Sequence, residues 1–217
     1  MKYTHVLFDL DGTLTDPKIG ITSSVAYALK YFDIAVEDLD SLCPFIGPPL
    51  RDSFQEFYGF NSQQTTLAIQ KFREYYEERG MYEASVYPGI PELLQQLKAA
   101  GATLLTATSK PTFLAGPVLE HFGLLSYLDF VSGSDPNEAQ AEKFQIISHA
   151  LKQGGMSDLN RVVMVGDRKF DVLGAKRAGI RSTGVLFGYG SREELEAADP
   201  DYLAETVSDL HDYLLED

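Results

Sequence analysis

The sequence predicts an α/β fold in which a doubly wound, Rossmann-like parallel sheet carries an inserted α-helical domain. Short apolar segments alternate with amphipathic helical segments along most of the chain, and this alternation is typical of a parallel sheet covered by helices. One long segment with helical patterns only, residues 16–85, separates the first apolar segment from the second. At 217 residues the chain is long enough to bury a substantial core.

Five apolar segments form the strands of the predicted sheet, and most of them are apolar on both faces. That pattern is expected of parallel strands that are covered by helices on both sides. The helical segments between them supply the crossover connections that a parallel sheet requires. The five segments are residues 6–10, 102–107, 130–131, 162–165 and 183–187.

Four helical segments of the sheet domain end within two residues of a glycine, the residue that commonly ends a helix. In the first of them Leu93, Leu94 and Leu97 share one face, as expected of a helix that packs against a sheet. The segments are residues 91–100, 113–122, 141–152 and 171–178, and the glycines are Gly101, Gly123, Gly154 and Gly179.

The insert contains three helical patterns, at residues 21–31, 50–58 and 64–78. We therefore expect two domains, an α/β domain formed by residues 1–15 and 86–217 and a helical domain formed by residues 16–85. Helical inserts that follow a first strand often form a lid over a site at the sheet edge. The helical domain is therefore expected to act as a cap.

The composition excludes several classes of partner. The chain has 18 Lys and Arg against 32 Asp and Glu, a net charge of −14, which argues against nucleic acids and anionic membranes as partners. The single Cys43 excludes an internal disulfide and fits a reducing cytoplasm. We see no apolar run typical of a signal peptide or a membrane span. We expect a cytoplasmic monomer or a weak homodimer.

Two acids stand at the end of the first predicted strand. Asp9 and Asp11 are one residue apart, and Gly12 follows them. Unpaired charges at the end of a buried strand cost several kcal/mol, and a bound cation is the usual remedy. Because carboxylate oxygens suit Mg²⁺, the pair predicts a magnesium site with a carboxylate nucleophile and a neighbouring acid/base.

Further polar side chains follow two other predicted strands. Thr108 and Ser109 come after residues 102–107, and Asp167 and Asp171 come after residues 162–165. The carboxyl ends of parallel strands lie at one edge of a sheet, where ligands of such folds bind. We therefore expect four carboxylates and a hydroxyl to converge there. Gly12 would allow a tight turn where a Cβ could clash with a ligand.

These motifs give the chain a resemblance to the haloacid dehalogenase superfamily of phosphohydrolases. Its first motif, Asp-x-Asp-Gly-Thr, stands at residues 9–13, and its Gly-Asp-x-x-x-Asp motif stands at residues 166–171. Thr108 is similar to the Ser or Thr of the second motif. Lys143 is similar to the motif lysine, although Phe144 replaces the proline that often follows it, and Arg168 replaces a common Ser or Thr.

The resemblance also covers the insert. It is similar to the small helical cap of the branch that includes phosphoglycolate phosphatases and β-phosphoglucomutases. The loop at residues 47–50 and the tail at residues 188–191 resemble the phosphoglycolate phosphatase side of that branch. The implied activity is Mg²⁺-dependent hydrolysis of a small phosphate ester, such as phosphoglycolate, a nucleoside 5′-monophosphate or a sugar phosphate.

The resemblance implies a role for each candidate residue. Asp9 would attack phosphorus and form an aspartyl-phosphate, while Asp11 would act as general acid and then as general base. Mg²⁺ would be held by the carboxylates of Asp9 and Asp167 and by the backbone carbonyl of Asp11, with Asp171 completing or orienting the metal shell.

The remaining candidates would bind the substrate. Thr108, Ser109 and the backbone near Gly12 would hold phosphoryl oxygens. Lys143 would neutralise Asp9 and the transferred group. Arg51, in the loop of the insert, would contact a substrate anion.

Other interpretations of these residues remain open in the sequence. Thr108 and Asp171 could cap helices, and Arg51, Lys110 and Lys143 could be exposed surface charges. A phosphomutase with the same nucleophile is an alternative function, and a non-enzymatic phospho-accepting domain is a weaker one. Nucleotide-dependent kinases and dehydrogenases are disfavoured because their glycine-rich phosphate-binding motifs are absent from the sequence.

Overall fold

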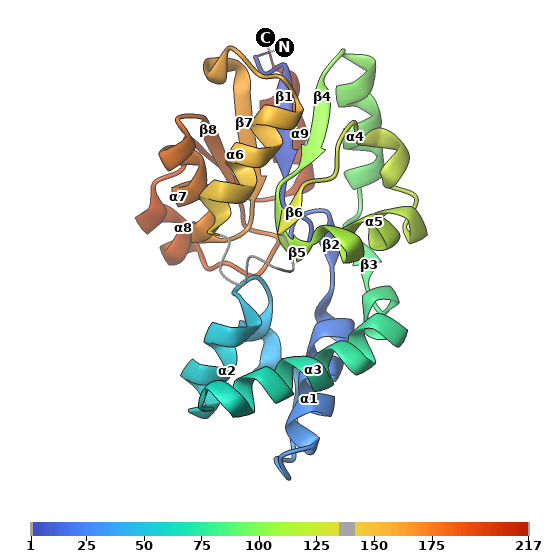
Figure 1. The fold of residues 1–217 in the computed structure, drawn as a ribbon. Coiled ribbons are helices and arrows are strands. Elements are labelled where there is room, and N and C mark those ends of the chain that lie inside the picture. The colour runs from blue at the N-terminus through green and yellow to red at the C-terminus, as the bar shows by residue number, and fades with distance from the viewer. Residues whose placement is uncertain (1, 135–141, 217) are drawn as a thin grey trace. The chain divides into compact units, whose positions relative to one another are not determined.

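The computed structural model of the chain describes residues 2–134 and 142–216. These residues form two compact units, one made of Met1–Asp16 with Val86–Asp217 and the other of Pro17–Ser85. The first unit contains the sheet, and the second is helical (Figure 1).

The first unit is built on a five-stranded parallel sheet in the order β4-β1-β7-β8-β9. The chain begins near the middle of this sheet at β1 and extends to both sides, which confirms the predicted doubly wound parallel fold. Residues Leu7, Leu105 and Met164 lie in register on neighbouring strands. The strands are β1 (His5–Phe8), β4 (Thr103–Thr106), β7 (Val162–Gly166), β8 (Arg181–Val185) and β9 (Tyr202–Ala204).

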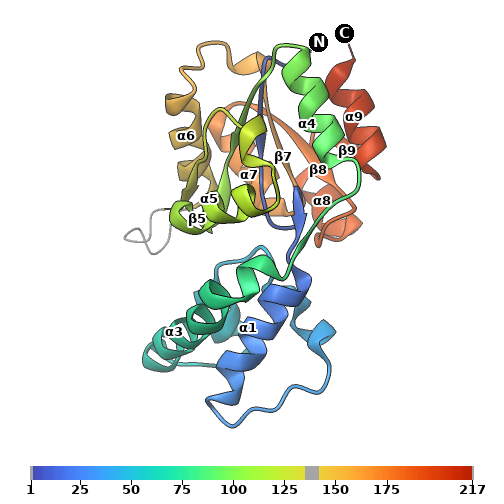
Figure 2. The same cartoon turned by 90° about the vertical axis from the view of Figure 1, so that its right-hand side faces the viewer.

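Helices lie on both faces of the sheet. On one face Ile147 of α6 and Ala175 of α7 join a buried cluster with Leu7, Leu105 and Met164. Helices α4 and α9 lie on the opposite face (Figure 2). The helices are α4 (Ile90–Ala99), α5 (Thr112–His121), α6 (Lys143–Gln153), α7 (Lys169–Ala178), α8 (Arg192–Ala198) and α9 (Val207–Leu215).

Short elements complete this unit. Strands β5 (Thr108–Pro111) and β6 (Gly133–Ser134) form a separate two-stranded sheet beyond the end of β4. Strands β2 (Thr15–Asp16) and β3 (Ser85–Val86) pair where the chain leaves the first unit and returns to it. Two short 3₁₀ helices span Leu125–Tyr127 and Leu159–Arg161.

Local sequence signals explain several helix ends. Gly179 adopts a left-handed φ of 72° immediately after α7, so its N–H can close the last turn. Thr206 and Asp209 form a reciprocal capping box at the start of α9, each side chain accepting a hydrogen bond from the other's backbone N–H.

The structure corrects some predicted elements. Residues 130–131 were predicted as a strand, but Phe130 makes only an isolated bridge to Leu105, and β6 begins at Gly133. Helix α7 was predicted to start at residue 171, but it starts at Lys169, because the Asp171 side chain caps it from inside its first turn. The helix predicted from residue 141 starts at Lys143, and residue 141 itself lies outside the described residues.

The second unit has its own core. Its helix α1 and the 3₁₀ helix that follows α3 approach closely at Gly20 and Gly80, where a Cβ on Gly20 would lie 1.9 Å from the Gly80 carbonyl oxygen. Phe54 stacks on Phe60 with ring centroids 5.9 Å apart. Its elements are α1 (Lys18–Lys30), a 3₁₀ helix (Leu39–Phe45), α2 (Leu50–Tyr58), α3 (Ser62–Glu78) and a second 3₁₀ helix (Gly80–Tyr82).

None of the helices in the described part of the chain combines the length and the apolar character that a bilayer crossing requires.

Candidate active site

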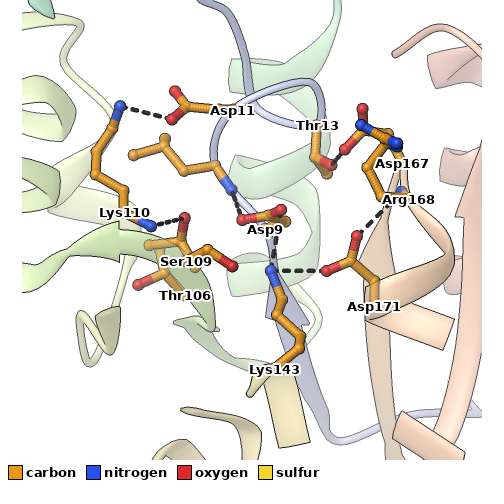
Figure 3. A network of polar contacts seen from close by, with 12 residues as sticks. Asp9, Asp11, Thr13, Thr106, Ser109, Lys110, Lys143, Asp167, Arg168 and Asp171 are labelled. Carbon is orange, nitrogen blue, oxygen red and sulfur yellow. Dashed lines mark hydrogen bonds and ion pairs between the residues drawn. The ribbon is translucent and has the colours of Figure 1, made fainter. Parts of the chain in front are cut away.

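Three buried carboxylates meet at the carboxyl edge of the sheet (Figure 3). Asp9 follows β1, where its N–H donates to the Val165 carbonyl at 2.9 Å, and Asp167 follows β7. Asp171 lies in the first turn of α7. One carboxylate oxygen from each of the three acids lies within 4.8 Å of the other two. We call this set the aspartate cluster.

Lys143 contacts two members of the aspartate cluster. Its Nζ lies 3.0 Å from Asp9 Oδ2 and 2.7 Å from Asp171 Oδ1, and the residue is 7% exposed. Burial alone would lower the pKa of Lys143, but the two carboxylates raise it well above its ordinary value. The side chain is therefore charged, and the alternative of an exposed surface lysine is wrong.

The aspartate cluster contains more acids than bases. If all three carboxylates were ionised, one ammonium would leave two negative charges uncompensated in a buried site. Burial and the neighbouring carboxylates raise the pKa of Asp167 well above its ordinary value. Burial likewise raises the pKa of Asp171, to about 6, although Lys143 opposes the shift. A divalent cation bound to these hard oxygen ligands would offset this charge, so the residues fit a metal site.

The loop at residues 188–190 holds Asp167. The Tyr189 N–H donates to Asp167 Oδ2 at 2.8 Å, and the Thr13 hydroxyl lies 3.5 Å from Asp167 Oδ1. A Cβ on Gly188 would lie 2.4 Å from the Asp167 Cβ, and a Cβ on Gly12 would lie 2.2 Å from Asp167 Oδ2. The two glycines therefore make room for this carboxylate.

In the sequence, residues 188–191 stood out only through their family resemblance, and Tyr189 was not predicted to contact Asp167. A backbone N–H has no signature in a sequence, so the glycines on either side of Tyr189 were the only available signal. Gly12 was predicted to leave space for a ligand. In the structure its φ of 87° and its close approach to Asp167 require the absence of a side chain.

Asp171 caps a helix and also belongs to the aspartate cluster. Its Oδ2 accepts a hydrogen bond from the Arg168 N–H at 3.1 Å, while its Oδ1 faces Lys143. A Cβ on Gly166 would lie 2.1 Å from the Asp171 Cγ, so this glycine also admits a carboxylate. The Arg168 side chain turns to Glu194 of α8, with Nε 2.8 Å from Oε1.

Asp11 lies outside the aspartate cluster and pairs with a different lysine. Lys110 Nζ lies 2.6 Å from Asp11 Oδ2, and Lys110 is 8% exposed (Figure 3). Burial raises the pKa of Asp11, and the adjacent Lys110 opposes that shift. The alternative interpretation of Lys110 as a solvated surface charge is therefore wrong.

Thr108 and Ser109 lie on β5, next to Lys110. Thr108 is buried, and its Oγ1 accepts a hydrogen bond from the Lys110 N–H at 3.2 Å. Helix α5 has Pro111 at its N-cap without a side-chain cap, so Thr108 does not cap it. The half-buried Ser109 accepts a bond from the Ser134 hydroxyl through its carbonyl, at 2.9 Å. Their predicted contact with a phosphoryl group stays a prediction.

Arg51 lies in α2 of the second unit and is half-buried. Its predicted contact with a substrate anion also stays a prediction.

Comparisons with known proteins agree on one family. The family model described as haloacid dehalogenase-like hydrolase matches residues 6–185. A 5′-nucleotidase from Pseudomonas aeruginosa is 40% identical over 214 residues, which cover 99% of this chain and 96% of the relative. The tyrosine-protein kinase PtkA of Mycobacterium tuberculosis is 35% identical over 213 residues, 96% of this chain and 72% of the relative.

A solved structure shows the same fold over the whole chain. The crystal structure of a predicted phosphatase from Clostridium acetobutylicum superimposes with a TM-score of 0.94, at 45% sequence identity and 99% coverage of both chains.

Proposed function

This chain belongs to the haloacid dehalogenase-like hydrolase family, and we propose that, as a phosphatase of that family, it hydrolyses a small phosphomonoester through a phosphorylated Asp9 with the help of Mg²⁺. The observation that carries the proposal is the aspartate cluster with Lys143 at its centre. In this proposal Asp9 is the nucleophile, the three carboxylates form the cation site, and Lys143 supplies a fixed positive charge in contact with Asp9 and Asp171.

Asp9 is the nucleophile in this proposal. Its Oδ1 accepts a hydrogen bond from the Leu10 N–H at 2.7 Å, and its Oδ2 faces the Lys143 ammonium. These two contacts fix the carboxylate before a substrate arrives, which lowers the entropic cost of attack. An oxygen of Asp9 would form a bond to phosphorus as the bond to the alcohol breaks.

Asp11 is the proposed acid and base. As the alcohol leaves, the protonated Asp11 carboxyl would give it a proton, and in the second step the carboxylate would take a proton from the water that attacks the aspartyl-phosphate. The ester is thereby converted to an alcohol and inorganic phosphate, and Asp9 is regenerated. A phosphomutase would instead return the phosphoryl group to the substrate.

The carboxylates of Asp9 and Asp167 and the backbone carbonyl of Asp11 would hold Mg²⁺, with Asp171 beside them. When bound, the cation would neutralise the aspartate cluster and polarise the phosphoryl group. Lys143 supplies a further positive charge at Asp9, and Thr108, Ser109 and the backbone at Gly12 would receive phosphoryl oxygens.

For the substrate, we propose a nucleoside 5′-monophosphate, phosphoglycolate or a sugar phosphate. The relative called a 5′-nucleotidase supports testing nucleotides first. The helical unit would act as a cap that selects the alcohol, with Arg51 as its candidate anion contact.

Phosphate release from a panel of such esters tests the proposal, with Mg²⁺, with a chelator, and with Mg²⁺ restored. We expect turnover that requires the metal, a trapped aspartyl-phosphate in rapid-quench mass spectrometry, and loss of both in Asp9→Asn. Full activity of Asp9→Asn would refute the mechanism. Isomerised sugar phosphate without released phosphate would indicate a mutase. ATP with a tyrosine peptide belongs in the panel because one relative is a tyrosine kinase.

A further inference from the structure

Lys110 forms the second buried ion pair of the site, and the reaction proposed above gives it no role. Its Nζ lies 2.6 Å from Asp11 Oδ2, with the lysine side chain 5% exposed and the aspartate side chain 15% exposed. A pair removed from water to this degree is a strong geometric restraint, because separating its members would leave a buried charge uncompensated.

The backbone of Lys110 is itself fixed. Its N–H donates to Thr108 Oγ1 at 3.2 Å, and β5, which carries it, pairs with β6. A Cβ on Gly133 of β6 would lie 2.3 Å from the Lys110 carbonyl oxygen, so the two strands approach as closely as a glycine permits. The ammonium therefore projects toward Asp11 from a rigid support.

We propose that Lys110 is a positioning residue for Asp11. It anchors Oδ2 of the acid away from the aspartate cluster and leaves Oδ1 to exchange the proton with the leaving oxygen. This inference rests on the proposed function, because it assigns Lys110 to the proton transfer of that reaction.

The aspartate cluster explains why such an anchor is needed. Asp11 is separated from Asp9 by a single residue, and Asp9 repels a second carboxylate nearby. Without a cation at Oδ2, the Asp11 side chain could adopt other rotamers. A displacement of about 1 Å in a reacting group can cost about 100-fold in rate.

Two aryl phosphates that differ only in a nitro group on the ring test this role. Phenyl phosphate has a basic leaving group that needs protonation, whereas p-nitrophenyl phosphate has an acidic one that needs little help. We expect Lys110→Met to lower kcat/KM by about 10- to 100-fold for phenyl phosphate and by less than about threefold for p-nitrophenyl phosphate. The parameter kcat/KM is the right one because it reports the steps up to the departure of the alcohol.

A double-mutant cycle shows whether Lys110 acts through Asp11. In an Asp11→Asn background, Lys110→Met should cause little further loss on phenyl phosphate, since the group that it positions is gone. Lys110→Arg keeps the charge and should restore part of the ratio between the two esters. Lys98→Met is the matched control, because Lys98 forms a 2.8 Å pair with Asp129 away from the site and should leave both rates unchanged.

The possible results distinguish a failure of the positioning role of Lys110 from a failure of the proposed function. If Lys110→Met and Lys110→Arg are folded by circular dichroism but lose equal activity on both esters, Lys110 binds the common phosphoryl group and the positioning role is overturned. If Lys110→Met does not fold, Lys110→Arg replaces it, and its ratio of kcat/KM for the two esters is compared with and without Asp11→Asn: a changed ratio that disappears in the Asp11→Asn background supports the positioning role, and an unchanged ratio overturns it. If the wild-type protein hydrolyses neither aryl ester nor any panel compound, the proposed function itself fails and the inference fails with it.

Discussion

Lys143 Nζ lies 3.0 Å from Asp9 Oδ2, so the proposed nucleophile and a buried cation are in direct contact. Because the same ammonium also meets Asp171 at 2.7 Å, one side chain joins the end of β1 to the start of α7. In the proposed reaction Lys143 therefore contributes both to the stability of the fold and to the chemistry, and the two contributions can be separated by experiment.

We expect Lys143→Met to lower kcat by about 10²- to 10³-fold, because a fixed positive charge at the transferred group is lost. The same change removes the ammonium that pairs with Asp9 and Asp171, and should lower the free energy of unfolding by about 3–5 kcal/mol. Steady-state kinetics and urea unfolding measure the two effects. Addition of Mg²⁺ should recover much of the stability but not the rate.

A variant that keeps both wild-type rate and wild-type stability would contradict this assignment. Lys176→Met is the control, since Lys176 forms a 2.8 Å pair with Asp199 at the surface and should change neither quantity by a measurable amount.

The loop at residues 188–190 gives a second prediction. A Cβ on Gly188 would lie 2.3 Å from the Gly12 carbonyl oxygen and 2.4 Å from the Asp167 Cβ, so Gly188→Ala must displace the Asp167 carboxylate. In the wild type, Mg²⁺ at 100 times its dissociation constant should stabilise the fold by about 2.7 kcal/mol, and chelation should remove that gain. We expect Gly188→Ala to lose most of this Mg²⁺-dependent shift in Tm.

Gly116→Ala is its matched control. Nothing lies within 4 Å of the added Cβ at this position in α5, and alanine favours a helix over glycine. This variant should keep the full response to Mg²⁺. An unchanged response in Gly188→Ala would show that the loop does not position Asp167, the proposed metal ligand.

A buried hydroxyl supplies a third prediction. Thr183 Oγ1 on β8 is buried and, within the described residues, has no hydrogen-bond partner. Burying an unpaired hydroxyl costs about 1–3 kcal/mol, so Thr183→Val should stabilise the protein by about 1 kcal/mol. Differential scanning calorimetry should show a higher Tm.

Thr106→Val is the same substitution in strand β4, but we expect it to have the opposite effect and to lower Tm. The Thr106 hydroxyl donates to the Ser132 carbonyl and accepts from the Ser132 N–H at 2.9 Å. Removing it takes away the partner of the buried Ser132 N–H, whereas the Ser132 carbonyl still accepts the Thr108 N–H at 3.0 Å, and the loss should cost about 1–3 kcal/mol. If both variants moved Tm in the same direction, hydrogen-bond satisfaction would not be the deciding factor.

The pattern of the sequence predicted the fold and the positions of most acids because both depend on short-range signals. Apolar strands that end in Asp9 and Asp167 must bring these residues to one edge once the sheet is parallel. Lys143 was a weaker prediction, because only its family spacing distinguished it from a surface lysine. Its burial depends on two carboxylates that are distant in the chain.

Other features lacked any local signal. Lys110 resembles a surface lysine in sequence, and its burial follows from the position of Asp11 in space. Strand β9 and helix α8 were not predicted, since the first has three residues and the second is largely charged. Both are held in place by the sheet and by buried Leu195 rather than by their own periodicity.

A fourth prediction concerns acid stability. Asp129 accepts hydrogen bonds from Lys98 Nζ at 2.8 Å and from the Leu104 N–H at 2.8 Å. Partial burial raises the pKa of Asp129, but these two donors outweigh it and lower the pKa below its ordinary value. A depressed folded-state pKa stabilises the protein above the unfolded-state pKa, near 4, and this stabilisation disappears as pH falls through the folded-state value.

Asp129→Asn should therefore lower the free energy of unfolding most at pH 7, and the gap to wild type should close between about pH 5 and pH 2. Urea unfolding across this range measures the gap, with the exposed Glu120→Gln as a control that should show none. A gap of constant size at every pH would mean that Asp129 contributes through its shape and not through its charge.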